Sequence, residues 1–331
     1  MNRAFRPVFS NEGGLYPMAF PSRPGSRRIA VIGGVNMDIT GTPDTSMIDG
    51  DSNPGTVVLS PGGVGRNLAE NLCRLGNHVY MVTVFGEDAN AGILKRHCLD
   101  IGLDLSMSVT VPGGRTSVYL CLNGCDGNVL GAVSDMAIVD GITPALLEPL
   151  LPELNRMDGV FMDANLPEEV LTFLGRNLTV PLIADPVSVK KSVRLKDALP
   201  YLLTMKPNVP EAEQLTGIRI GTDAGLEKAA EALYACGVKN VFISLGARGV
   251  HVYDGICHRN LPCYPGPVVN TTGCGDAFLA SAGDALLAGL GAFEAASAGL
   301  TASALCARTT LAVSPDLTRN RLYTVPAGPS V

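Results

Sequence analysis

Short apolar runs alternate with helix-type segments along most of this chain, and that rhythm restricts the folds open to it. The apolar runs span residues 28–33, 79–85, 160–163, 182–185, 202–206 and 241–245. Helix-type patterns lie between them at 64–75, 90–102, 144–155, 167–177, 209–216 and 223–236. Repeated strand–helix–strand units assemble into a parallel sheet that is covered by helices on both faces. The sequence therefore predicts an α/β fold around a mainly parallel central sheet.

Two stretches, around 39–60 and 115–134, interrupt this rhythm. Each holds alternating strand patterns punctuated by turns, such as Thr56-Val57-Val58-Leu59, where a single apolar run would otherwise stand. Closely spaced alternating strands of this kind indicate a separate small sheet. We expect this sheet to be inserted into the main domain and to serve as a lid.

Composition excludes several classes of protein. The net charge is −6, so the chain lacks the basic field that attracts nucleic acid or an anionic membrane. The nine cysteines include no C-x-x-C pair, which argues against a zinc site and fits free thiols in a reducing, cytoplasmic compartment. The apolar stretch 285–307 is broken by Gly289-Leu290-Gly291, so it predicts two buried helices and not a membrane span.

Residues 1–27 carry several Pro, Gly and Arg and show no alternating pattern. They hold no apolar segment of the kind found in secretory signals. We expect a disordered leader here. Organelle targeting is the alternative, because Glu12 is the one acid among several Arg residues.

Polar residues follow the apolar runs at several places. In open α/β sheets, ligands bind beyond the carboxyl ends of the strands. Turns favour Asn and Asp, so one such residue means little, but several of them indicate a shared site at one rim. These residues are Asn36, Asp38, Asp163, Asn165, Asp185 and Asn208.

A glycine-spaced turn precedes the helix-type run 278–290 and reads Asn270-Thr271-Thr272-Gly273-Cys274-Gly275-Asp276. Gly273 and Gly275 allow the backbone to approach a ligand, and the first helical turn offers unpaired N–H groups. Such a turn binds an anion, and Asp276 beside it can accept a proton. Phosphoryl transfer to an alcohol requires this combination. A glycine-rich helix start capped by Asp is the alternative interpretation.

A second glycine segment, Ser60-Pro61-Gly62-Gly63-Val64-Gly65-Arg66-Asn67, opens another helix-type run. Gly33-Gly34-Val35-Asn36-Met37-Asp38 follows the first apolar run. Together with the turn at 270–276, these segments resemble the ribokinase-like (PfkB) carbohydrate kinases, and the resemblance covers roughly residues 28–325. The chain has no G-x4-G-K-[ST] and no G-x-G-x-x-G after its first strand, so the P-loop and Rossmann dinucleotide interpretations both fail.

The resemblance is strongest to the pseudouridine kinase branch of that family, through residues 51–55, 61–67 and 134–136. It implies a ribokinase-like three-layer α/β sandwich with a small β-sheet lid. In relatives the lid often also pairs two subunits, so a homodimer through the lid is expected.

The resemblance also implies a sugar site. It assigns Asp38 and Asn67 to ribose hydroxyls, and Gly62-Gly63 to the lid hinge and to close backbone contact. Such groups suit a sugar, because charged hydrogen bonds contribute about 1.5–3 kcal/mol each. A turn cap at Asp38 and a helix cap at Asn67 are the structural alternatives. The candidate substrate-binding residues are Asn36, Asp38, Gly62, Gly63, Asn67 and Asn165.

A nucleotide site is implied in the same way. Asn208 and Glu211 match the family's N-x-x-E element, in which Glu211 would hold Mg²⁺ largely through water. The alternative is a helix capping box. Ser244, Gly246 and Gly249 would contact ATP, or would simply form a tight glycine turn.

Two residues depart from the usual family pattern. Asn270 stands where relatives carry an Asp that helps to hold a monovalent cation. The lost charge weakens the case for K⁺ activation, although Asn270 and Thr272 still offer oxygen ligands. Cys274 stands where Ala is common. With Gly273 and Gly275 it would form the anion hole, and its thiol at a helix N-terminus is expected to be reactive.

The expected reaction is ATP- and Mg²⁺-dependent phosphorylation of a primary hydroxyl of a small molecule, by resemblance the 5′-hydroxyl of pseudouridine, with Asp276 as the base. A kinase for another ribosyl or ketose substrate, such as ribose, adenosine or fructose, is the nearer alternative. A non-catalytic sugar-binding regulator on an inactive kinase fold is the other. The retained Gly273, Gly275, Asp276 and Glu211 argue against it.

Overall fold

Strand β1 (Arg28–Ile32) runs inside an eight-stranded sheet and explains why the apolar runs of this chain are continuous. In the computed structural model, which describes residues 25–323, its side chains alternate between two cores. Ile29 and Val31 pack on one face of the sheet, and Ala30 and Ile32 pack on the other. All four are fully buried, so neither face could tolerate the polar half of an alternating strand.

The eight strands are ordered β14-β13-β12-β11-β10-β9-β1-β4. The six strands from β12 to β4 are parallel. At one edge, β13 pairs antiparallel with β12, and β14 pairs antiparallel with β13. The chain order reverses at β1, which lies between β4 and β9, and ligands bind at such a switch point in open α/β sheets. Besides β1, the strands are β4 (His78–Val82), β9 (Gly159–Asp163), β10 (Leu182–Asp185), β11 (Leu202–Met205), β12 (Asn240–Ser244), β13 (Val250–Tyr253) and β14 (His258–Leu261).

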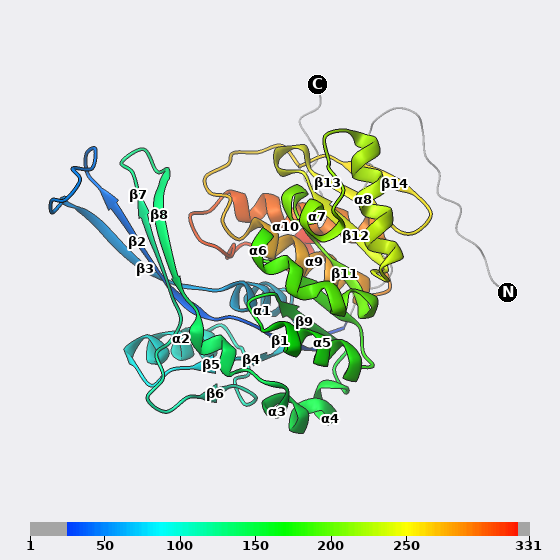
Figure 1. Cartoon of the computed structure of the whole chain (residues 1–331), viewed down its shortest axis with the longest axis horizontal. Helices are drawn as coiled ribbons and strands as arrows, with labels where there is room; N and C mark the ends of the chain where they lie inside the picture. Colours follow the sequence, from blue (N-terminus) through cyan, green and yellow to red (C-terminus); the bar gives the residue numbers. More distant parts are fainter. Residues whose placement is uncertain (1–24, 324–331) are drawn as a thin grey trace.

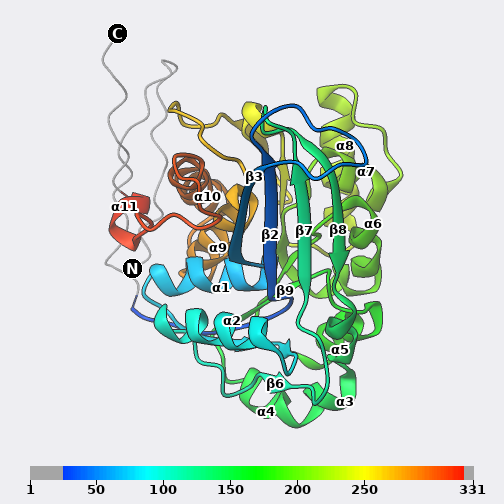
Figure 2. The same ribbon diagram turned by 90° about the vertical axis from the view of Figure 1, so that its left-hand side faces the viewer.

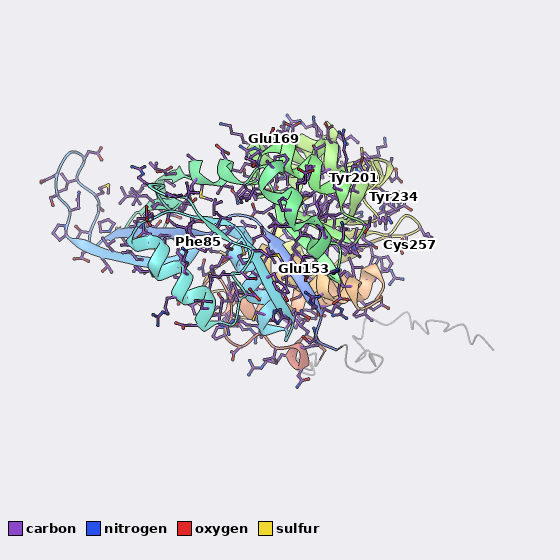
Figure 3. All side chains as sticks on the ribbon, turned by 90° about the horizontal axis from the view of Figure 1, so that it is seen from below. Phe85, Glu153, Glu169, Tyr201, Tyr234 and Cys257 are labelled. Atoms are coloured by element: carbon purple, nitrogen blue, oxygen red, sulfur yellow. The ribbon has the colours of Figure 1, made fainter. Side chains whose placement is uncertain are left out.

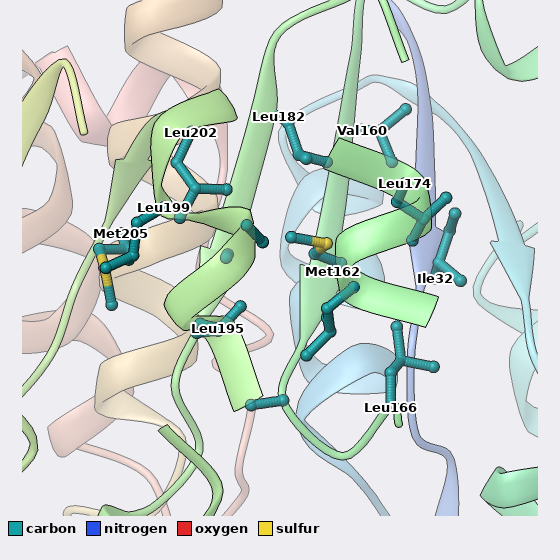
Figure 4. Close-up of a cluster of buried hydrophobic side chains, with 14 of the residues drawn as sticks. Ile32, Val160, Met162, Leu166, Leu174, Leu182, Leu195, Leu199, Leu202 and Met205 are labelled. Atoms are coloured by element: carbon teal, nitrogen blue, oxygen red, sulfur yellow. The ribbon is translucent and has the colours of Figure 1, made fainter. Parts of the chain in front are cut away.

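Helices cover both faces of this sheet, which confirms the predicted three-layer sandwich (Figure 1). One layer contains α1 (Val64–Arg74), α2 (Ala89–Asp100), α9 (Cys274–Leu287) and α10 (Ala292–Ala307). The other contains α5 (Glu168–Asn177), the 3₁₀ segment η3 (Val193–Tyr201), α7 (Val209–Thr216) and α8 (Asp223–Ala235). In this second layer, leucines of α5 and η3 pack onto Val160 and Met162 of β9 (Figure 4).

The predicted lid is a separate four-stranded sheet with the order β3-β2-β7-β8. Its strands are β2 (Asn36–Pro43), β3 (Gly55–Gly62), β7 (Val118–Asn123) and β8 (Val129–Asp135). They extend away from the sandwich as one projecting sheet, with all four strands lying side by side (Figures 1 and 2). β2 and β7 pair in parallel, which joins the two insertions into one sheet.

One predicted helix is broken, one strand was not predicted, and the predicted leader is mostly outside the described residues. The helix expected at 144–155 is split into α3 (Pro144–Leu147), a 3₁₀ turn (Glu148–Leu150) and α4 (Leu151–Leu154). Pro149 and Pro152 lack the N–H groups that a continuous helix needs. β14 was missed because its sequence, His-Arg-Asn-Leu, carries no apolar run. The leader lies outside the described residues except for 25–27, and Arg27 is tied to the fold by an ion pair with Asp284 (2.8 Å).

Smaller elements complete the described chain. β5 (Val84–Phe85) and β6 (Val109–Thr110) form a short ribbon, and Phe85 lies in the core beside α2 (Figure 3). The remaining segments are the 3₁₀ turns η1 (Ala137–Gly141) and η4 (Gly246–Arg248) and the helices α6 (Val189–Ser192) and α11 (Arg319–Tyr323).

The apolar stretch at 285–307 forms the end of α9 and the whole of α10, as two separate helices. Among residues 25–323, none of the helices combines the length and apolar character needed to cross a bilayer.

Gly283 provides a test of how tightly α9 packs on the sheet. A Cβ atom at this position would lie 2.6 Å from Cζ of Phe161 on β9, so Gly283→Ala should overfill the core. We expect the free energy of unfolding to fall by about 1–3 kcal/mol, measured by urea denaturation.

The matched control is Gly92→Ala in α2, where an added Cβ meets no atom within 4 Å. Because Ala is the better helix former, this change should raise the free energy of unfolding by about 0.5–1 kcal/mol. Equal stabilisation by both substitutions would show that α9 is not packed as described.

Candidate active site

The loop after β1 is fixed by a buried carboxylate. Asp163, the last residue of β9, accepts hydrogen bonds from the backbone N–H of Gly34 (2.9 Å) and of Asn165 (2.8 Å). A Cβ atom on Gly33 would lie 2.3 Å from Oδ2 of Asp163, so only glycine allows this approach. The loops that follow two neighbouring strands are thereby locked together at the carboxyl rim of the sheet.

The predicted sugar-binding side chains gather above this loop. Asn36 donates to Asp38 (2.5 Å), and the Asp38 carboxylate lies directly over the α-carbon of Gly62. Burial raises the pKa of Asp38, against the hydrogen bond from Asn36 and the nearby Arg66. Asn165 lies in the loop after β9, and its side-chain oxygen accepts a hydrogen bond from Lys191 (2.6 Å).

Asn67 connects this group to the predicted base. Its side-chain N–H donates to Oδ2 of Asp276 (2.6 Å), so a residue of α1 holds a residue of α9. The side-chain oxygen of Asn67 in turn accepts from the buried guanidinium of Arg66, which also pairs with Glu70. Sequence reasoning did not single out Arg66. Its position between the glycines and Asn67, on a buried face of the helix, was the available signal.

The Asp276 carboxyl is a strong proton acceptor in this setting. Burial, followed by the repulsion from Asp185, raises its pKa to about 8, against the opposing effects of Asn67, Lys206 and Arg66. A carboxylate with such a pKa takes up a proton readily near neutral pH, which is what general-base catalysis needs.

The start of α9 offers unpaired donors beside Asp276. Gly273 precedes the helix with φ 80°, and a Cβ there would lie 1.9 Å from the carbonyl oxygen of Ala312, so the turn requires glycine. The N–H groups of Gly275 and Asp276 meet no acceptor among the described residues, whereas those of Cys274 and Ala277 do. Two free amides at a helix N-terminus favour an anion.

Cys274 contributes its backbone to this turn, but its side chain faces α10. Its thiol lies 3.5 Å from the carbonyl oxygen of Ser303 and beside Cys306. The hydrogen bond from Cys306 lowers the pKa of the Cys274 thiol, against the effect of burial. The thiol therefore does not line the anion-binding turn, and its reactivity stays a prediction.

The predicted nucleotide residues lie at the ends of β11 and β12. Asn208 and Glu211 form the capping box of α7, with the bonds Glu211 N to Asn208 Oδ1 (2.9 Å) and Asn208 N to Glu211 Oε2 (2.8 Å). The capping box that the sequence offered as the alternative interpretation is therefore present. It leaves the second Glu211 oxygen without a hydrogen bond among the described residues. Ser244 lies next to Asn208 through a β-bridge.

Three further predicted residues lie in the loop after β12 and in the loop before α9. Gly246 has open space around its α-carbon, whereas Gly249 is glycine because a Cβ would lie 1.9 Å from the carbonyl oxygen of Leu261. Asn270 uses its side-chain oxygen to accept from Thr272 N (3.0 Å) and its amide to donate to Thr310 (3.3 Å). Both Asn270 groups are thus engaged within the loop itself.

Within residues 25–323, no group of three or more His, Cys, Asp or Glu side chains is arranged to hold a metal ion. The free oxygen of Glu211 is the hard donor type that a hydrated Mg²⁺ accepts.

The raised pKa of Asp276 predicts a stability effect that does not depend on activity. An Asp in the unfolded chain has a pKa of about 3.9, so the folded state holds this proton more tightly and loses relative stability as pH rises from there to about 8. Asp276→Asn removes this loss. The variant should be more stable than the wild type at pH 8, by up to about 1.4 kcal/mol for each pH unit crossed, with little difference at pH 4.

Thermal unfolding at both pH values measures this effect. Asp284→Asn, on the same helix, is the control, because it removes the buried ion pairs with Arg27 and Arg319 and should lower stability at both pH values. An Asp276→Asn variant that is no more stable than the wild type at pH 8 would show that the Asp276 pKa is not raised.

The chain is similar to known proteins over most of its length. The model of the family described as "pfkB family carbohydrate kinase" matches residues 26–319. A pseudouridine kinase of Escherichia coli (strain K12) is 33% identical over 292 residues, which are 87% of this chain and 93% of that protein. The ribokinase of Bacillus subtilis (strain 168) is 28% identical over 261 residues, covering 77% of this chain and 84% of that protein.

A solved structure shares the fold. Arabidopsis thaliana ribokinase, complexed with ribose and ATP, superposes with a TM-score of 0.80 at 22% identity, covering 91% of this chain and 100% of that chain. The chain belongs to the pfkB family of carbohydrate kinases and is a phosphotransferase with an alcohol group as acceptor.

Proposed function

We propose that this protein transfers the γ-phosphoryl group of ATP to the 5′-hydroxyl of pseudouridine. The observation that carries the proposal is the hydrogen bond between Asn67 and Asp276 (2.6 Å). It brings a side chain suited to sugar hydroxyls into contact with a carboxylate of raised pKa. The free amides of Gly275 and Asp276 lie at the same turn.

These groups support a direct in-line transfer. Asp38 and Asn67 would orient the ribose through its hydroxyls, so that the 5′-oxygen points at the start of α9. Asp276 would accept the hydroxyl proton as the bond from the 5′-oxygen to phosphorus forms. The bond from phosphorus to the bridging oxygen breaks, and ADP leaves. The free amides of Gly275 and Asp276 would stabilise the charge that develops, whereas the Cys274 amide already donates to the carbonyl oxygen of Thr271.

Asn208, Ser244, Gly246 and Gly249 would hold the nucleotide at the ends of β11 and β12. The free carboxylate oxygen of Glu211 would hold Mg²⁺ through water, and that ion neutralises phosphate charge when bound. K⁺ binding at Asn270 and Thr272 is not part of the proposal, because the Asn270 side chain is already bonded within its loop.

Pseudouridine is proposed as the substrate on the similarity to the E. coli enzyme and on the position of one lid segment. Met136, which directly follows β8, lies 3.2 Å from where a Cβ on Gly34 would stand, next to Asn165. The segment 134–136 therefore reaches the substrate side of the rim. The other lid segment, 51–55, lies at the far turn of the β2–β3 hairpin (Figure 1). It would reach the base only if the lid moves.

Ribose is the second candidate, because ribokinases match this chain in sequence and in fold. Both substrates present the same 5′-hydroxyl to Asp276, so the choice between them depends on the base. Pseudouridine carries one ring N–H more than uridine. A pocket that accepts a hydrogen bond from this N–H leaves the acceptor unpaired when uridine binds, at a cost of about 1–3 kcal/mol.

A coupled ADP-release assay with pseudouridine, uridine, ribose and adenosine tests the proposal. We expect pseudouridine to exceed uridine in kcat/KM by at least about tenfold. The catalytic control is Asp276→Asn, which should lower kcat by about 10²–10⁴ with little change in substrate affinity.

Comparable efficiency with uridine, or a preference for free ribose, would retain the kinase and reject pseudouridine. Turnover of Asp276→Asn within about fivefold of the wild type would remove Asp276 from the mechanism.

We also propose that the lid pairs two copies of the chain. Strand register places Asp38, Ser60 and Tyr119 on one face of the small sheet. The opposite face carries apolar side chains that are 39–65% exposed. Exposed apolar patches of this kind mark interaction surfaces. The residues are Val57, Leu59, Leu120, Leu122 and Val133.

Light scattering after size-exclusion chromatography should give twice the monomer mass for the wild type. Leu59→Glu places a charge on the apolar face and should yield monomers. Val58→Glu, on the neighbouring position of the same strand but the opposite face, should remain dimeric. A monomeric wild type at micromolar concentration would contradict the pairing.

A further inference from the structure

Lys206 is a buried cation to which the mechanism above gives no direct role. It follows β11 directly, and only 8% of its surface is exposed. Among residues 25–323, its ammonium group makes no hydrogen bond and no ion pair. Lysines are almost never buried without a partner, because removing the charge from water is costly. This ammonium group is therefore held for a partner that the protein itself does not supply.

The neighbouring carboxylates do not fill that role. Asp185 accepts from the N–H of Val187 (2.7 Å), and Asp276 accepts from Asn67 (2.6 Å). Glu211 accepts from the N–H of Asn208 (2.8 Å). Burial raises the pKa of all three carboxyls, and the charge of Lys206 partly opposes each rise, so Lys206 is close enough to act on them electrostatically. Each acid is nevertheless fixed by a different donor.

The ammonium group is directed at the start of α9. A Cβ atom on Gly275 would lie 3.3 Å from Nζ of Lys206 and 3.7 Å from its Cε. The glycine therefore leaves the space in front of the ammonium group free of side-chain atoms. The N–H groups of Gly275 and Asp276, which have no acceptor among the described residues, belong to the same turn. An ammonium and two amides thus converge on one position.

We propose that Lys206 is a catalytic residue whose ammonium group binds the phosphoryl group during its transfer from the nucleoside triphosphate. This inference rests on the proposed kinase function and adds a residue that sequence reasoning did not assign. Lys206 contributes no bond that is made or broken, since the proton of the alcohol goes to Asp276 and the leaving group is ADP.

The physical role follows from the charge of the phosphoryl group. In the transition state, negative charge spreads over the oxygens that are neither attacking nor leaving. A fixed cation in a buried position stabilises this charge more than it would in water. An ammonium group suits the task as a compact point charge.

The experiment compares Lys206→Met with Lys190→Met, a control that removes an exposed lysine of α6. Lys206→Met should lower kcat by about 10²–10³, the usual cost of losing one donor to developing charge. Its affinity for a non-hydrolysable ATP analogue, measured by calorimetry, should fall by about ten- to a hundredfold. Affinity for ADP, which lacks the γ-phosphoryl group, should stay within about threefold of the wild type. Lys190→Met should change none of these values.

Two further variants keep the test decisive if Lys206→Met does not fold. Lys206→Gln also removes the charge and should reproduce both losses, whereas Lys206→Arg keeps the charge and should recover at least about tenfold in kcat over Lys206→Gln. Equal losses of affinity for ADP and for the ATP analogue would assign Lys206 a structural role and overturn the proposal. Wild-type turnover in Lys206→Gln would do the same. A wild-type protein that phosphorylates none of the four test substrates would instead refute the kinase function itself.

Discussion

The hydrogen bond from Asn67 to Asp276 joins two helices whose contacting residues are 209 positions apart in the sequence. Both helices, α1 and α9, cover the same face of the sheet, and both begin at a glycine with positive φ. A Cβ on Gly63 would lie 2.5 Å from the carbonyl oxygen of Gly34, and one on Gly273 would lie 1.9 Å from that of Ala312. The two glycines therefore let both helix starts reach the same point of the rim.

Burying several acids at this rim makes their ionisation unfavourable, and the surrounding residues offset this effect only in part. Burial raises the pKa of Asp163, Asp185 and Asp276, so each of them resists ionisation in the folded state. Glu70 shows the opposite balance. Its own burial is outweighed by His97, Arg66 and Arg74, and its pKa falls to about 2. The cations that support α1 are thus paired, whereas Lys206 at the rim is left unpaired. The paired cations stabilise α1, whereas the unpaired ammonium group of Lys206 is available to a ligand.

The sequence contained most of the fold, because fully buried parallel strands leave continuous apolar runs that need no tertiary information. It also indicated Asp276 through a glycine-spaced turn, and Asp38 and Asn67 through a family resemblance, and the roles of all three stay predictions. Arg66 and Lys206 were not recognised, because their importance depends on burial and on which partners they lack. Pro149 and Pro152 indicate the split of the 144–155 helix in the sequence itself. The role of the Asn208–Glu211 pair as a capping box was considered, and the structure contains it.

The central claim is that Asn67 and Asp276 act as one unit, so that the helix that binds the sugar also orients the base. A double-mutant cycle on kcat at saturating substrate, with Asn67→Ala, Asp276→Asn and the combined variant, tests this claim most directly. If the two residues act together, the combined variant should be no more than about threefold slower than Asp276→Asn alone, because Asn67 then has no base left to position. If the losses multiply, the two side chains work independently, and the hydrogen bond that joins them does not position the base.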